Sequence, residues 1–181
     1  MPKPGIARFV ALASEPFRSP CRYNRREMGL LDWLDPTREW PAVSGPAPDV
    51  NRMTLQFDSL RFGDPIDSAR FLGRPGAFEW HSRIKKDCDL RYAKKGLQLH
   101  FREDRLIEIR FVIGTARPLA PDGTPLTREI DKDRIIALFG EPDPGGSDDE
   151  TLQIFHGNGV ASDFDLDESG HLTEWALYPD D

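Results

Sequence analysis

Apolar and polar residues alternate in several short stretches of the chain. In the clearest of them, Leu97, Leu99 and Phe101 are apolar, while Gln98 and His100 between them are polar. Side chains of a β-strand point alternately to opposite faces, so this period of two predicts a strand with one buried face. The alternation, or a shorter form of it, recurs at 90–92, 107–111, 152–154, 160–166 and 172–177. The pattern predicts a series of short strands joined by tight turns.

Two short helices are predicted from a motif that occurs twice. The motif is an Asp, a Gly nine residues later and a Pro two residues after the Gly: Asp64, Gly73 and Pro75, then Asp131, Gly140 and Pro142. An Asp side chain caps the first turn of a helix, Gly adopts the left-handed conformation that ends one, and Pro prevents its resumption. A period of about 65 residues with the same punctuation predicts two copies of one unit.

The predicted fold class is therefore α+β, with two tandem units, each a short helix followed by a three- to four-stranded antiparallel meander. Stretches rich in Pro and Gly divide the chain. The expected divisions are a disordered or over-called N-terminus (1–27), an apolar appendage and linker (28–51), the first unit (52–113), a linker (114–126) and the second unit (127–181). Met28 is an alternative start of the protein.

A second motif repeats along with the helices. Gly96 and Phe101 have the same spacing as Gly159 and Phe164, with Leu or Val after each Gly, and a Leu opens the next strand in both copies. This order of helix, Gly-x-Pro and meander resembles the bacterial outer-membrane assembly lipoprotein BamE (SmpA or OmlA). It is also similar to the β-lactamase inhibitor proteins, which carry two such units in tandem. The resemblance covers residues 60–178. It implies a non-catalytic fold that presents a sheet and loops to another protein.

Charge is distributed unevenly along the chain. The net charge is -7, but residues 126–181 hold 3 basic and 15 acidic side chains, a net charge of -12. Nucleic acid is not an expected partner of this region, because binding a polyphosphate requires Lys and Arg to displace its counterions. A cationic protein surface would be attracted. The alternative is that the charge only keeps the protein soluble.

The sequence also bears on location. No apolar run reaches the roughly 18 residues that a membrane-spanning helix needs, so no membrane span is expected. The two cysteines, Cys21 and Cys88, are far apart and favour free thiols in a reducing compartment over a disulfide. The N-terminal segment does not resemble a signal peptide. These features together predict a cytoplasmic, bacterial protein.

No catalytic residue, cofactor or metal is predicted. The histidines, which are His81, His100, His156 and His171, lack the spacing of a zinc site. One alternative is that His156 and His171 approach each other across strands, near Asp163, and form a weak metal or acid-base cluster. Exposed, solvated histidines are the simpler interpretation. Cys88 lies between two aspartates, whose charge raises the pKa of a thiol and makes it a poor nucleophile.

The predicted function is that of a non-catalytic, soluble protein-binding module of the inhibitor or immunity type, with a basic protein as its partner. The residues expected to contact the partner are Asp163, Asp165, Asp167 and Glu174 of the second unit, and Trp33 and Trp40 of the apolar appendage. One alternative is an enzyme or small-ligand receptor with a cleft between the units, lined by Trp175, Tyr92 and His100. Another is a regulatory or structural subunit that docks through residues 28–40. The same apolar segment would otherwise pack on the main domain. The oligomeric state is left open.

Overall fold

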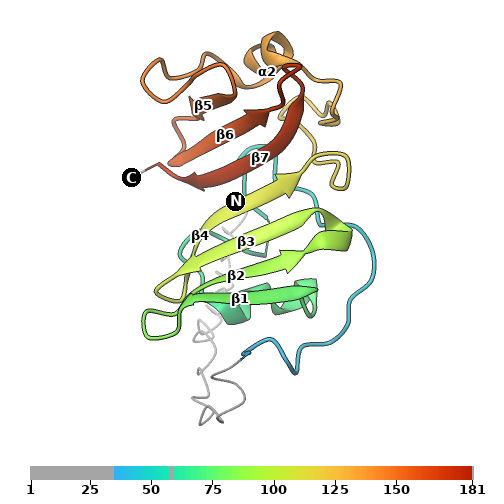
Figure 1. Cartoon of the computed structure of the whole chain (residues 1–181), viewed down its shortest axis with the longest axis vertical. Coiled ribbons are helices and arrows are strands. Elements are labelled where there is room, and N and C mark those ends of the chain that lie inside the picture. Colours follow the sequence, from blue (N-terminus) through green and yellow to red (C-terminus); the bar gives the residue numbers. More distant parts are fainter. Residues whose placement is uncertain (1–34, 58, 181) are drawn as a thin grey trace, which may run out of the picture.

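The computed structural model describes residues 35–57 and 59–180, and its main feature is one seven-stranded antiparallel sheet (Figure 1). The strands are β1 (Ala77–Ser82), β2 (Asp87–Tyr92), β3 (Leu97–Arg102), β4 (Arg105–Val112), β5 (Thr151–Phe155), β6 (Val160–Leu166) and β7 (Leu172–Pro179). Their order across the sheet is β1-β2-β3-β4-β7-β6-β5. The alternating stretches of the sequence all lie in these strands, so the strand predictions are confirmed.

The prediction of two tandem helix-plus-meander units is wrong. Strand β4 pairs with β7 through Ile109 opposite Leu177 and Phe111 opposite Trp175, so the strands form a single continuous sheet. The periodicity of a strand indicates which face is buried but not which strand lies beside it. Pairing through β4 and β7 covers two strand edges that separate units would have left open.

Helical structure is limited. The α-helix α2 (Lys132–Phe139) begins as predicted, because the Asp131 side chain accepts a hydrogen bond from the Arg134 amide at 2.9 Å. The other predicted helix is the 3-10 helix η1 (Ile66–Leu72), which has no side-chain cap. The Asp64 side chain does not cap η1; it accepts a hydrogen bond from the backbone amide of Arg61. A second 3-10 segment, η2 (Ala93–Lys95), connects β2 and β3.

The core lies on one side of the sheet. Alternate strand residues on that side are fully buried, among them Leu99, Phe111 and Trp175. They pack with η1, with α2 and with residues of 40–60 and 116–130 in one hydrophobic cluster. In Figure 1, η1 lies behind β1 and β2. Among the described residues, no helix or strand covers the opposite face of the sheet.

The apolar appendage is described only from residue 35 onward, so Trp33 and the first part (28–34) of the helix or docking segment expected over 28–40 lie outside the described residues. Trp40 is 5% exposed and belongs to the core cluster. Burial on the domain already removes the large apolar surface of Trp40 from water and leaves little of it for a partner to contact. Residues 36–39 form turns and not a helix.

None of the helices in the described part of the chain has the length and apolar character needed to cross a membrane.

The connection between β2 and β3 depends on a glycine beside the β4–β7 pairing. Gly96 has φ 61, and a Cβ atom on it would overlap the backbone nitrogen of Ala116. We predict that Gly96→Ala lowers the free energy of unfolding by about 2–4 kcal/mol, from left-handed backbone strain plus overpacking. Urea denaturation measures the loss.

The control for this prediction is Gly170→Ala. Gly170 has φ 77, but nothing lies within 4 Å of the position of its Cβ. Its substitution therefore tests backbone strain alone, with an expected loss of about 1–2 kcal/mol. Equal losses in the two variants would contradict the close packing of residues 112–116 against Gly96.

Candidate functional site

Among the described residues, polar and charged side chains are concentrated on the face of the sheet that no helix or strand covers. Alternation within each strand places polar side chains on this face, opposite the core. They are Glu79, His81, Asp89, Arg91, Gln98, His100, Glu108, Arg110, Gln153, Asp163, Asp165, Glu174 and Tyr178. We call this set the polar face. Hydrogen bonds and ion pairs join its members into clusters around Asp89 and around Arg110.

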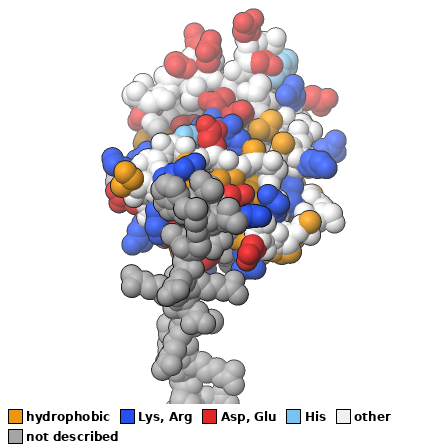
Figure 2. Space-filling view, turned by 60° about the horizontal axis from the view of Figure 1, so that its bottom comes forward, with side chains coloured by type: hydrophobic (Ala, Val, Ile, Leu, Met, Phe, Trp, Pro, Cys, Tyr) orange, Lys and Arg blue, Asp and Glu red, His pale blue; other side chains and the backbone are white. Residues whose placement is uncertain are grey.

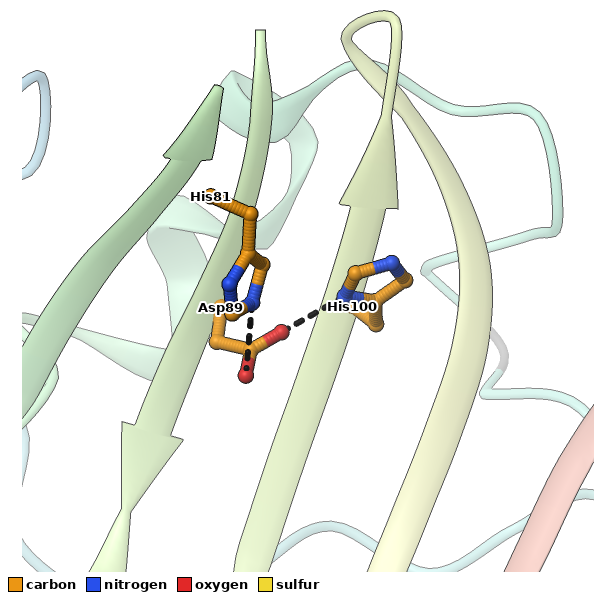
Figure 3. A group of neighbouring side chains, drawn as sticks. All are labelled: His81, Asp89 and His100. Carbon is orange, nitrogen blue, oxygen red and sulfur yellow. Dashed lines mark hydrogen bonds and ion pairs between the residues drawn. The ribbon is translucent and has the colours of Figure 1, made fainter. Parts of the chain in front are cut away.

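The first cluster surrounds Asp89 in the middle of β2. This side chain is only 5% exposed, and its carboxylate lies between two imidazoles (Figure 3). His100 Nδ1 lies 2.6 Å from Oδ1, and His81 Nε2 lies 3.1 Å from Oδ2. Oδ2 also accepts hydrogen bonds from Gln98 at 2.9 Å and from Arg91 at 3.1 Å. A buried carboxylate needs such donors, because burial without them costs several kcal/mol.

These contacts decide the protonation state of Asp89. Burial by itself raises the pKa of this carboxyl group, but hydrogen bonds from His100, His81 and Arg91 outweigh burial and hold the pKa below its ordinary value of 3.8. Asp89 is therefore an anion at neutral pH. It presents a fixed negative charge to the two imidazoles.

The second cluster surrounds Arg110 of β4. Its guanidinium donates to Glu108 at 2.7 Å, to Glu174 at 2.9 Å and to Asp165 at 3.5 Å. Glu174 and Asp165 lie directly opposite each other in β7 and β6, where two like charges repel. Arg110 thus connects the β1–β4 half of the sheet to the β5–β7 half and offsets this repulsion. Burial lowers the pKa of Arg110, but its bonds to Glu108 and Glu174 raise it by more.

Between the two clusters the polar face is hollowed into a depression of about 510 Å³. Its lining comes from β1, β2, β3, β4 and β7: His81, Asp89, Gln98, His100, Arg102, Ile107, Glu108, Arg110 and Glu174. Because these residues stand on hydrogen-bonded strands, the backbone that carries them is held in place.

A larger hollow of about 710 Å³ lies elsewhere, between residues 43–49, Phe71 and residues 115–118. Lys95 lines it, but the Lys95 ammonium already donates to the carbonyl oxygens of Gly45 and Pro46 at 3.0 and 3.4 Å. This lysine fixes the loop against the domain. Most residues that line this hollow are apolar or glycine, whereas the depression of the polar face is lined almost entirely by polar and charged side chains.

Three of the predicted contact residues lie together on the polar face: Asp163, Asp165 and Glu174. Asp163 accepts a hydrogen bond from the Tyr178 hydroxyl at 2.6 Å, and Thr151 donates to Asp165. Asp167 does not lie in a strand. It follows β6, and its carboxylate accepts from the amides of Ser169 and His171 in the turn.

The cleft lined by Trp175, Tyr92 and His100 does not exist in this arrangement. Trp175 and Tyr92 are 0% and 4% exposed and belong to the core. His100 lies on the polar face, on the other side of the sheet. Aromatic packing fills the space behind β4 and β7, where Phe111 and Trp175 stack at 5.5 Å.

The sequence pattern did not predict that His81 and His100 converge on Asp89, because neither histidine has the helical or Cys-x-x-Cys spacing of a metal site. The turn that ends at Gly96, between the alternating stretches at 90–92 and 97–101, places Asp89 opposite His100. Counting residues across that turn would have found the pair. His81 was harder to place, because the pairing of β1 with β2 is irregular between Trp80 and Ser82.

The alternative in which His156 and His171 approach each other is not observed. His156 lies 2.7 Å from the Ser162 hydroxyl and against the Phe139 ring, and burial lowers its pKa. His171 lies beside Asp167 at 3.8 Å. Burial, together with the negative charges of Asp89, Asp104 and Asp87, raises the pKa of the Cys88 thiol to about 12, in agreement with the prediction that Cys88 is a poor nucleophile.

Comparison with known proteins adds no identification: no family model matches the chain, and neither a curated protein nor a solved structure matches it.

The ion pairs around Arg110 predict how the stability of an Arg110 variant depends on pH. Arg110→Met keeps an unbranched apolar stem but leaves Glu108, Asp165 and Glu174 without their shared cation. Because these groups are about one-third exposed, we expect the variant to lose only about 1 kcal/mol of unfolding free energy at pH 7. Chemical denaturation at a series of pH values measures the loss.

The loss should shrink as the pH falls toward 4. Burial raises the pKa of Asp165 above 3.8, and Arg110 opposes that rise, so removing Arg110 raises the pKa further. A carboxyl group with a raised pKa in the folded protein destabilises it above that pKa, and protonation removes the cost. Arg102→Met on the same face is the control, with little change at either pH. A loss for Arg110→Met that grows at low pH would contradict the cluster.

Proposed function

We propose that this protein is a non-catalytic binding module that recognises a basic protein through the β5–β7 half of its polar face. The observation that carries the proposal is the position of Asp163, Asp165 and Glu174. These three carboxylates lie together on the side of the sheet that no described helix or strand covers.

The charge balance of this half favours a cationic partner. Three carboxylates lie there, and Arg110 is the cation that reaches them from β4, through Glu174 and Asp165. Asp163 has Tyr178 as a neutral hydrogen-bond donor and no cation in a described ion pair. Figure 2 shows acidic side chains gathered toward the top of the view and Lys and Arg mostly below them. The field at this end would steer a basic surface toward the face.

The architecture supports binding more than catalysis. The strands hold these side chains on a rigid surface, as a preformed binding site requires. Docking through residues 28–40 receives less support, because Trp40 is buried in the core.

We predict that neutralising this half of the face removes partner binding. The variant combines Asp163→Asn, Asp165→Asn and Glu174→Gln, which keeps the shape and the hydrogen-bond acceptors. The immobilised full chain should retain a basic protein from a bacterial lysate at low salt and release it at high salt. The variant should retain at least about fivefold less of that protein.

The matched control combines Asp133→Asn, Glu141→Gln and Asp149→Asn. These three acidic residues are exposed, lie outside the sheet, and give the same change of charge. The control should retain the partner as the unmodified chain does. Equal losses in both variants would show that net charge alone is responsible, and undiminished binding by the face variant would place the interface elsewhere. Either result would refute the proposal.

A further inference from the structure

The β1–β3 half of the polar face contains a cluster of two histidines and one aspartate, which binding to a basic protein does not require. His81, Asp89 and His100 come from three neighbouring strands, and their side chains converge on one point (Figure 3). One nitrogen of each imidazole and one carboxylate oxygen all lie within 4.8 Å of one another. Among the described residues, this is the one group of three or more such side chains.

The distances suit a shared metal ion. Ions such as Zn²⁺ bind His nitrogen and carboxylate oxygen at roughly 2.0–2.2 Å, which places two donors of a tetrahedral site roughly 3.4 Å apart. Asp89 lies 3.1 Å from His81 and 2.6 Å from His100. Each histidine nitrogen therefore needs to move away from its nearest Asp89 oxygen by less than about 1 Å, and all three donors already lie within 4.8 Å of one another. Both histidine side chains have room to move, since they are 41% and 24% exposed.

The present hydrogen bonds mark the place that a cation would take. Because the anionic Asp89 carboxylate can only accept, each imidazole directs an N–H at it, and these two protons lie where one divalent ion would bind all three groups. Oδ1 of Asp89 has His100 as its described partner, whereas Oδ2 also accepts from Gln98 and Arg91. Oδ1 is thus the available ligand, and the bonds to Oδ2 fix its orientation, as outer partners do in metal sites.

The charge of Arg91 opposes a second cation nearby, but Arg91 also pairs with Glu79 at 3.0 Å. Within this group the two carboxylates, Asp89 and Glu79, outnumber the single guanidinium. Both histidines and Asp89 line the 510 Å³ depression, so a bound ion would keep positions open to water.

We propose that His81, Asp89 and His100 bind a divalent first-row transition-metal ion, of which Zn²⁺ fits the donor set best. Imidazole nitrogen with a carboxylate oxygen suits Zn²⁺, Co²⁺ and Ni²⁺, whereas Ca²⁺ and Mg²⁺ prefer sites made only of oxygen. Three protein ligands leave at least one coordination position for water at the floor of the depression. This inference stands independently of the basic partner, which contacts the other half of the face.

The test is titration of the full-length protein, stripped with a chelator, with Zn²⁺ by calorimetry and with Co²⁺ by visible absorption. We predict one ion per chain, a higher Tm with Zn²⁺, and Co²⁺ bands in the visible range. His81→Gln and His100→Gln should each weaken binding by more than the roughly 10–100-fold that loss of an outer partner costs. His171→Gln, another exposed histidine with a carboxylate neighbour, is the control and should bind as the unmodified chain does.

A second measurement needs no variant. In a ¹⁵N-labelled sample, Zn²⁺ should shift the imidazole nitrogens of His81 and His100 and leave those of His156 and His171 in place. No binding at millimolar Zn²⁺, or binding that survives in both His81→Gln and His100→Gln, would overturn the proposal. An equal loss in His171→Gln would also overturn it, because it would show only general attraction of metal to surface histidines.

Discussion

The pairing of β4 with β7 is the interaction on which the rest of this structure depends. Phe111 and Trp175 stand opposite each other at this seam and stack with ring centroids 5.5 Å apart. Trp175 also contacts Phe139 of α2 and Phe164 of β6, and its indole N–H donates to the Ser162 hydroxyl at 3.0 Å. A polar group on a fully buried ring is thereby satisfied. The seam joins the two halves of the chain into one sheet with one core.

The same pairing organises the opposite face. Because side chains alternate along β4, burial of Phe111 on one side places Arg110 on the other, beside Ala176 and next to Glu174. A guanidinium from one half of the chain thus meets carboxylates from the other. The interactions around Arg110 are modest individually, since each partner is about one-third exposed. These interactions matter mainly for where the side chains lie. They separate an acidic half of the polar face from a half that contains His81 and His100.

The two halves of the polar face differ in the chemistry they offer. Around Asp89, nearly every donor is committed to a buried carboxylate, which makes a compact site of fixed geometry. Around Asp163 and Glu174, the carboxylates are more exposed and spread over two strands, as suits a broad contact with another protein. A small cation needs convergence of a few ligands, whereas a protein surface needs area and complementary charge. One sheet supplies both without a cleft between separate units.

Local features of the sequence determined much of this fold. Except for β1, alternation identified every strand and its buried face, Asp131 identified the start of α2, and the turn at Gly96 contained the register that sets Asp89 opposite His100. These features depend on near neighbours along the chain, which is why they can be inferred from residue order. The tertiary structure alone decided that β4 lies beside β7, that Trp40 joins the core, and that His81 reaches Asp89 past an irregular strand pair. Those outcomes depend on contacts between distant segments, and the identity of a partner strand is set by packing of the whole core and not by any local period.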